Sequence, residues 1–242
     1  KTRPQIVRTV GKHLWLDPGE RETQDYSVSV VMDVVNRYDV DGIHFDDYFY
    51  PYRSYADPGT EGKRPDFPDD ASWKKFGAAT KLSRDDWRRQ NVDVFVRRVY
   101  ESVKAAKPWV KFSVSPFGIW RPGYPPQIKG MDPCVELYAD SRKWLQNGWL
   151  DFFTPQLYWA IEPKEQSFPV LLDWWNQQNP KRRHIWPGMN TTKVGTWEPG
   201  EITQQIALSA KQPISAGHVH WNMKALLRSS ELQSALKRGP YA

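Results

Sequence analysis

The sequence predicts an α/β fold of the (β/α)8 barrel type, on three observations. Strand and helix patterns alternate regularly along the 242 residues, a length at which such barrels are found. Regular alternation implies a parallel sheet with crossover helices. The loops after the predicted strands are long and rich in aromatic and polar residues, whereas the loops before them are short. This asymmetry favours a barrel, whose chemistry lies at the carboxyl ends of its strands; an open doubly wound sheet is the alternative.

The N-terminal part of the chain predicts a loop, then one helix and one strand. Apolar residues at helical spacing predict an amphipathic helix over 21–38, and these residues are Val28, Val31, Met32, Val35 and Tyr38. Gly42–Phe45 predicts a short strand. A long loop rich in Pro, Gly and Asp follows over about 48–82.

The clearest helical pattern begins at Ser83. Ser83 and Asp86, three residues on, resemble a capping box, which marks the start of a helix. Behind them one apolar stripe repeats at helical spacing, formed by Val92, Phe95, Val96, Val99, Val103 and Ala106. The pattern therefore predicts a long helix with one buried face.

The alternation continues to the end of the chain. Further strands are predicted over 109–115, 150–157, 184–189 and 216–221, and further helices over 135–147, 167–178, 199–211 and 229–238. Ser167 is the expected N-cap of its helix, and Pro199 the expected first helical residue of the next. Five strands cannot close an eight-stranded barrel. We therefore expect residues 1–242 to be a single barrel domain that holds about strands four to eight, without its N-terminal units.

Composition excludes several classes of protein. No run of about 18 apolar residues exists, so no membrane span is expected. The chain opens KTRPQIVRTV without an initiator Met or a signal peptide, so we expect a processed or truncated piece. The net charge of +6 is spread over helix faces without a nucleic-acid motif, and the single Cys134 cannot form an internal disulfide. No phosphate-binding glycine loop, GxSxG elbow or CxxC is present, and no cofactor is predicted.

The segment DVDGIHFDDYFYPY carries the first candidate site residues. Side chains at i and i+2 of a strand share a face, so His44 and Asp46 are expected to point the same way. Asp46 falls at the carboxyl end of the predicted strand, where a barrel keeps its catalytic groups. A structural role, as a helix cap or a partner of Arg53, is the alternative. Asp47 is expected on the other face or in the loop, and Asp41 in a structural turn.

Four motifs in order give a family resemblance. YDVDGIHFDDYFYPY, with LWLDPG before it and SVSPFGIWR and TPQLYW after it, resembles the glycosyl hydrolase-like 10 family of bacteria. The resemblance implies a (β/α)8 barrel, glycosidase activity on peptidoglycan glycan strands, and export to the periplasm or cell envelope. DGIHFD is also similar to the DGxRxD motif on the fourth strand of α-amylase-type barrels, with Asp46 at the position of the nucleophile. His44 stands in place of their arginine, and no carboxylate ends the predicted fifth strand, where their acid lies.

Hydrolysis of a glycosidic bond usually needs two carboxyl groups. Asp46 is the first, and Asp47 and Glu162 are the candidates for the second. Adjacent acids usually diverge in direction, which makes Asp47 a poor partner for Asp46. Glu162 follows the predicted strand 150–157 but precedes Pro163, and a surface glutamate is the alternative.

Polar and aromatic residues at predicted strand ends are the candidates for binding a polysaccharide. Sugar recognition combines hydrogen-bonding groups with apolar ring faces, and the 13 tryptophans of the chain offer such faces. The candidates are His44, Tyr48, Tyr50, Trp120, Arg121, Gln156, Tyr158, Trp159, Asn190, His220 and Trp221. A carbohydrate-binding barrel without hydrolysis is the rival interpretation. A metal-dependent hydrolase or deacetylase, with His218 and His220 as ligands beside His44 and Asp46, is a third; no metal is predicted, because such pairs usually lie on a first strand.

Overall fold

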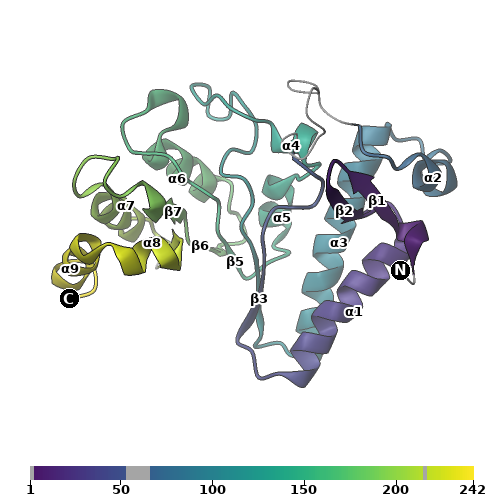
Figure 1. The fold of residues 1–242 in the computed structure, drawn as a ribbon, viewed down its shortest axis with the longest axis horizontal. Helices are drawn as coiled ribbons and strands as arrows, with labels where there is room; N and C mark the ends of the chain where they lie inside the picture. The colour runs from purple at the N-terminus through teal and green to yellow at the C-terminus, as the bar shows by residue number, and fades with distance from the viewer. Residues whose placement is uncertain (1–2, 53–65, 215–216) are drawn as a thin grey trace. The chain divides into compact units, whose positions relative to one another are not determined.

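The computed structural model describes residues 3–52, 66–214 and 217–242, which form an α/β structure with parallel strands (Figure 1). The chain divides into two compact units. Unit 1 comprises Lys1–Ile43, Asp47–Phe112 and Pro133–Trp144, and unit 2 comprises His44–Asp46, Ser113–Asp132 and Leu145–Ala242. A single barrel domain over residues 1–242, and the closure of a barrel, stay predictions.

Unit 1 begins with a β-hairpin that was not predicted. After a 3-10 turn at Pro4–Ile6, strands β1 (Val7–Val10) and β2 (His13–Leu16) pair antiparallel, with Val10 opposite His13. The expected loop before the first helix is therefore wrong. Each strand has only four residues, too few for the alternation of apolar and polar side chains to stand out in the sequence.

The two long helices of unit 1 confirm their predictions. Helix α1 (Arg21–Arg37) packs against α3 (Arg84–Ala106). Ser83 is the N-cap of α3, and its hydroxyl oxygen accepts a hydrogen bond from the Asp86 backbone N–H at 3.1 Å. The same hydroxyl donates to the Asp86 carboxylate at 2.6 Å. Four valines of the predicted stripe are buried, at positions 92, 96, 99 and 103.

The predicted loop over 48–82 lies partly outside the described residues, which omit 53–65. Its last part holds a short helix, α2 (Asp70–Ser72), that continues into a π-helical turn, η3 (Trp73–Gly77). Neither was predicted.

The main sheet has the order β3-β4-β5-β6, formed by Gly42–Phe45, Lys111–Val114, Phe152–Phe153 and His184–Ile185 (Figure 1). β4 and β5 pair in parallel, with Ser113 opposite Phe152, and β5 and β6 do the same. β7 (Gly188–Asn190) and β8 (Val219–Trp221) form a second parallel pair. The parallel sheet that the alternation predicted is confirmed.

Two predicted strands are shorter or interrupted. The strand expected over 184–189 is divided into β6 and β7 at Pro187, and the strand expected over 150–157 is reduced to β5 ahead of Pro155. Proline has no backbone N–H to donate to a ladder, which explains both breaks. Beyond Pro155 the chain resumes parallel pairing, because Gln156 bridges to Phe117 on one side and to Gly188 on the other.

The helices after β4 also differ in detail from prediction. The helix expected over 135–147 is two helices, α4 (Pro133–Glu136) and α5 (Ser141–Asn147), separated by Tyr138 with its positive φ of 54°. Helix α7 (Glu201–Ala210) begins after Gly200, whose φ of 83° is left-handed, and not at Pro199. The expected last helix is confirmed as α9 (Ser230–Arg238), and a short α8 (Met223–Arg228) precedes it.

Helix α6 (Phe168–Gln177) helps to form the core of unit 2. Ser167 is its N-cap residue as predicted, although its hydroxyl donates to the Ile161 carbonyl at 3.0 Å and caps no helical N–H. The ring of Trp175 lies against Phe153 of β5 with centroids 4.7 Å apart, and its indole N–H donates to the Gly118 carbonyl at 2.8 Å. In the described part of the chain, no helix has the length and apolar character needed to cross a bilayer.

Candidate active site

A layer of polar side chains lies at the carboxyl ends of β3, β4 and β5 in unit 2. The imidazole of His44, on β3, hydrogen-bonds through Nδ1 to the Ser113 hydroxyl and through Nε2 to the Ser115 hydroxyl at 2.8 Å. Ser113 and Ser115 share a face because they are two residues apart in extended chain. The ring of His44 also stacks on Phe152 of β5, with centroids 6.2 Å apart and planes at 9°. These contacts hold the imidazole in one orientation.

Desolvation by the surrounding protein lowers the pKa of His44, and the nearby negative charge of Asp46 opposes this shift. A lowered pKa favours the neutral imidazole, in which one ring nitrogen donates a hydrogen bond and the other accepts. Serine hydroxyls can act in either role, so both nitrogens are satisfied.

Asp46 lies just beyond β3 and is exposed to solvent. Its Oδ1 accepts a hydrogen bond from Gln156 Nε2 at 2.9 Å, and the same amide nitrogen donates to the Ser115 carbonyl at 2.8 Å. Ser115 therefore links the two predicted residues His44 and Asp46. Its hydroxyl contacts His44, and its carbonyl binds Gln156, which in turn donates to Asp46. We call His44, Asp46, Ser113, Ser115 and Gln156 the strand-end cluster.

The two serines of this cluster were not predicted. They lie in the motif SVSPFGIWR, and both are buried. The signal that could have found them is their spacing of two residues, the same spacing that paired His44 with Asp46.

Asp47 differs from Asp46 in its surroundings. Asp47 belongs to unit 1 and its side chain is 2% exposed. The Tyr52 hydroxyl donates a hydrogen bond to its carboxylate, and the half-exposed ring of Tyr48 meets Tyr52 edge to face at 5.8 Å. Such burial with a phenol donor is typical of a structural carboxylate.

The prediction for Tyr50 needs correction. Its ring is fully buried in unit 1, in edge-to-face contact with Phe67 at 5.1 Å and with Tyr138 at 4.7 Å. Burial raises the pKa of the Tyr50 hydroxyl well above its ordinary value. The segment after Phe45 is not a strand, and Tyr50 packs in the core of unit 1 and not at a strand end.

Glu162 is exposed, ahead of the 3-10 turn at Lys164–Gln166. A general acid is typically held in an apolar pocket that keeps it protonated. Glu162 lies after β5, as expected, but it is exposed to solvent and not held in an apolar pocket.

Several predicted aromatic residues of unit 2 form ring pairs. Tyr158 lies against Trp221 with centroids 6.3 Å apart, and Trp221 is 48% exposed. Trp159 meets Phe117 edge to face at 5.7 Å. The ring of Trp221, at the end of β8, thus presents part of its apolar surface to solvent.

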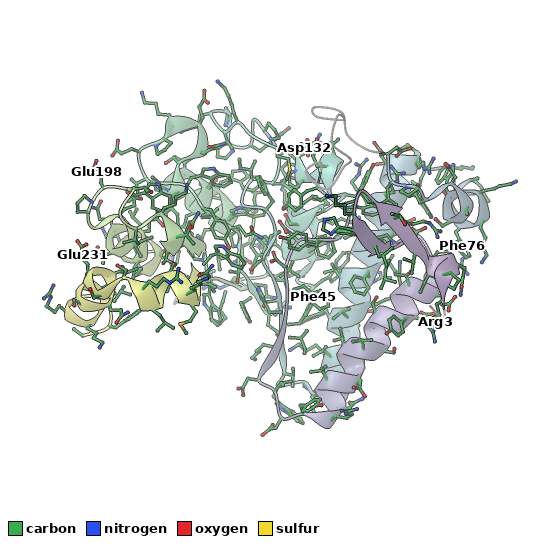
Figure 2. All side chains as sticks on the ribbon, in the orientation of Figure 1. Arg3, Phe45, Phe76, Asp132, Glu198 and Glu231 are labelled. Atoms are coloured by element: carbon green, nitrogen blue, oxygen red, sulfur yellow. The ribbon has the colours of Figure 1, made fainter. Side chains whose placement is uncertain are left out.

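Trp120 and Arg121 lie together in the loop after β4. Trp120 stacks on Trp174 of α6 with centroids 5.8 Å apart and planes at 20°. The Arg121 guanidinium pairs with Asp132, Nε to Oδ2 at 2.8 Å, and lies 6.0 Å from the Trp120 ring centre; Figure 2 labels Asp132. The ion pair holds the arginine beside the ring.

Asn190 and His220 have local partners in unit 2. Asn190 caps the turn at Thr191–Lys193, accepting at Oδ1 from the Thr192 backbone N–H at 3.2 Å. His220 Nε2 hydrogen-bonds to the Tyr241 hydroxyl at 3.0 Å, and His218 contacts the same hydroxyl. Burial lowers the pKa of both histidines, that of His218 to about 4.

No group of three or more His, Cys, Asp or Glu suited to a metal ion occurs among the residues that the structure describes. His218 and His220 face Tyr241, whereas His44 faces Ser113 of β4 and Ser115 just beyond it.

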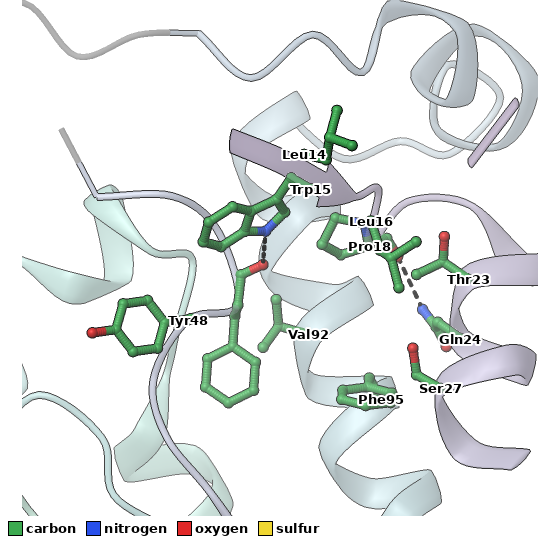
Figure 3. Close-up of a pocket in the computed structure, with 11 residues that line it drawn as sticks. Leu14, Trp15, Leu16, Pro18, Thr23, Gln24, Ser27, Tyr48, Val92 and Phe95 are labelled. Carbon is green, nitrogen blue, oxygen red and sulfur yellow. Dashed lines mark hydrogen bonds between the residues drawn. The ribbon is translucent and has the colours of Figure 1, made fainter. Parts of the chain in front are cut away.

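Unit 1 holds an apolar pocket of about 320 Å³ between β2, α1 and α3 (Figure 3). The Trp15 indole N–H donates to the Phe49 carbonyl at 3.2 Å at one side of it. Of the predicted site residues, Tyr48 alone lines this pocket, together with Leu14, Trp15, Leu16, Pro18, Thr23, Gln24, Ser27, Phe49, Val92 and Phe95. Among the described residues, the lining carries no charged side chain, and neither Asp46 nor Glu162 is part of it.

The chain is similar to proteins from two bacteria. It is 35% identical over 238 residues to the glycosyl hydrolase YngK of Bacillus subtilis (strain 168), a match that covers 93% of this chain and 45% of that protein. It is 38% identical over 212 residues to the glycosyl hydrolase DigH of Escherichia coli (strain K12), covering 86% and 46%. The chain thus spans about half the length of the curated relatives it matches.

Among solved structures, bee venom hyaluronidase aligns over 92% of this chain and 65% of that chain, with a TM-score of 0.40 and 11% identity. This likeness is too distant to bear on fold or function. Residues 2–205, by contrast, match the glycosyl hydrolase-like 10 family, in agreement with the four motifs. The chain therefore belongs to the glycosyl hydrolase-like 10 family.

Proposed function

We propose that this protein is a glycoside hydrolase of a bacterial cell-envelope polysaccharide, with peptidoglycan glycan strands as the substrate. The observation that carries the proposal is the Asp46 carboxylate, which is exposed at the carboxyl end of β3 and held by Gln156. Membership of a glycosyl hydrolase-like family and two relatives named glycosyl hydrolases support it. The whole protein would be a (β/α)8 barrel in the periplasm or cell envelope.

Asp46 is assigned the role of nucleophile or of the base that stabilises an oxocarbenium ion. Both roles need an ionised carboxylate in a defined direction beside the anomeric carbon. The amide of Gln156 provides a fixed donor for one carboxylate oxygen. His44, whose two ring nitrogens are both bound by the serines, places an imidazole of lowered pKa near this carboxylate.

Glu162 is assigned the role of proton donor. It follows Trp159 on the loop after β5, whereas Asp47 is buried against Tyr52. A bound sugar chain would exclude water from Glu162, as the site of a general acid requires. The distance between the two carboxyl groups in that complex would decide whether the anomeric configuration is retained or inverted. Retaining enzymes hold the two groups about 5–5.5 Å apart, and inverting enzymes hold them further apart.

Substrate contacts are assigned to aromatic and polar groups of unit 2, chiefly the exposed Trp221 with the half-buried Tyr158, and the half-buried Trp120 with the exposed Arg121. Rings offer apolar faces to sugars, and the guanidinium offers donors to their hydroxyl or carboxyl groups. The net charge of +6 would draw the protein to an anionic cell-wall polymer.

The test is the release of new reducing ends from purified glycan strands, with and without stem peptides, by the full-length protein. Asp46→Asn should lower the rate by about 10²-fold or more, and Glu162→Gln should do the same for substrates with a poor leaving group. Asp173→Asn is the matched control, because Asp173 also accepts a hydrogen bond from a glutamine amide, at 2.5 Å from Gln212. Equal activity in wild type and Asp46→Asn would overturn the assignment of Asp46.

A non-catalytic carbohydrate-binding barrel is the second candidate. The exposed surroundings of Glu162 favour it, since they lack the pocket of a general acid. If wild type and Asp46→Asn bind glycan strands equally and neither releases product, the protein binds sugar without cleaving it.

A further inference from the structure

Gln156 was expected to contact the sugar, but its contacts point to a different role. We propose that Gln156 is a positioning residue for Asp46, so that the reactive carboxylate is aligned by an amide from a neighbouring strand end. This inference rests on the proposed function, in which Asp46 acts on the glycosidic bond. Two observations support the inference: the two hydrogen bonds that the Gln156 amide nitrogen donates, and the fixed position of the Gln156 backbone.

The backbone of Gln156 is held on both sides. Its N–H donates to the Pro116 carbonyl at 3.0 Å, and the residue bridges in parallel to Phe117 and to Gly188. A Cβ atom on Gly118 would lie 2.2 Å from the Gln156 carbonyl oxygen, so only glycine permits this approach. The side chain therefore starts from a point that tertiary structure defines closely.

The orientation of the amide follows from its partners. Both groups at 2.8–2.9 Å are acceptors, the Ser115 carbonyl oxygen and the Asp46 carboxylate, so the nitrogen and not the oxygen of the amide must face them. One N–H is bound by the peptide carbonyl, which leaves the other directed at Asp46. A flexible side chain thus becomes a fixed donor.

Ser115 contacts several residues of this arrangement at once. Its backbone N–H donates to the Phe45 carbonyl at 2.8 Å, its hydroxyl contacts His44 and its carbonyl anchors Gln156. His44 and Phe45, which precede Asp46, and the amide that faces it therefore all contact Ser115, just beyond β4. This arrangement suits a carboxylate whose direction matters for reaction.

The proposal predicts a separation of kinetic effects in the full-length protein. Gln156→Leu keeps a side chain of similar size but removes the hydrogen-bond donor. It should lower kcat by about 10-fold to 100-fold, which is the scale of a hydrogen bond to a charged group. KM should change little. A sugar-binding glutamine would instead raise KM. Gln212→Leu, which removes a glutamine donor from Asp173, should leave both constants unchanged.

A second variant gives a readout that a merely structural residue would not change. Gln156→Glu is nearly isosteric and places a second carboxylate beside Asp46, which disfavours the ionised form of the pair. The acid limb of the pH–rate profile should therefore move upward by about one pH unit or more. Gln212→Glu is the control and should not move it.

Nuclear magnetic resonance separates this inference from the proposed function. The side-chain carboxyl carbon of Asp46, titrated in wild type and in Gln156→Glu, should show its midpoint at higher pH in the variant, whether or not the protein cleaves glycans. No hydrolysis with a displaced midpoint would remove the proposed function and keep the Gln156–Asp46 contact. An unchanged midpoint, or a loss confined to KM, would overturn the positioning role.

Discussion

The rings of Tyr50 and Tyr138 meet edge to face in unit 1, with centroids 4.7 Å apart and planes at 70°. Their hydroxyl groups differ. The Tyr138 hydroxyl accepts from Arg88 Nη1 at 2.6 Å and donates to Asp85 at 3.0 Å. The Tyr50 hydroxyl is buried and has no hydrogen-bond partner among the described residues.

This difference predicts opposite effects of the same substitution. Tyr50→Phe removes an unsatisfied polar group and should leave the free energy of unfolding unchanged or raise it by up to about 1 kcal/mol. Tyr138→Phe should lower it by about 1–3 kcal/mol, because it leaves a buried guanidinium donor without its acceptor. Urea unfolding of the two variants measures both values. Equal losses would contradict the assigned burial of Tyr50, as would a loss of glycan binding in Tyr50→Phe alone.

The buried pair of Arg88 and Asp69 should be among the costliest contacts of unit 1 to break. Arg88 is 2% exposed, and its Nε and Nη2 donate to the two oxygens of Asp69 at 2.7 and 2.6 Å. Arg88→Met should lower the free energy of unfolding by about 1.5–3 kcal/mol, because the buried Asp69 loses its charged hydrogen bonds to Arg88 but keeps that from Arg84 Nε at 3.0 Å. Arg97→Met breaks a pair with Glu101 at 3.8 Å on the helix surface, and should change the free energy of unfolding by less than about 1 kcal/mol.

The pKa of His44 should report on the charge of Asp46. Asp46 raises that pKa against the stronger lowering by desolvation. Asp46→Asn removes the negative charge, so the pKa of His44 should fall further. Proton resonances of the imidazole followed against pH measure it, with Asp173→Asn as the control. A rise, or no change, would show that the two side chains do not interact as the cluster requires.

His218 should make the stability of the protein depend on pH. Its pKa is lowered from 6.5 in the unfolded chain to about 4 in the folded one, through burial and the neighbouring His220. Between these values the unfolded chain binds more protons than the folded one, so the free energy of unfolding should fall as pH drops from 6.5 to about 4. Above 6.5 this contribution is fully present.

The matched variants isolate this dependence. His218→Gln should flatten the decline of the unfolding free energy across that window, whereas His184→Gln, at an exposed position, should not. The difference between wild type and each variant, measured by urea unfolding at several pH values, removes the contribution of the acidic residues. An equal slope in wild type and His218→Gln would contradict the burial of this ring.

Local patterns determined much of the secondary structure. Helix α3 is readable because its capping residues and its valine stripe lie within one continuous stretch, and α1 and β3 are readable for the same reason. The predicted strand Gly42–Phe45 also placed Asp46 at a strand end. These features depend on residues close together in the chain.

Tertiary structure decided which side chains meet. Gln156 contacts Asp46 across 110 positions of sequence, and Ser115 contacts His44 across 71, because parallel pairing aligns the ends of three strands. Tyr50 is buried by Phe67 and Tyr138, which no periodicity near it indicates. Strand register and core packing are long-range properties, so the sequence alone could name Asp46 as a candidate but not the amide and hydroxyl groups that lie near it.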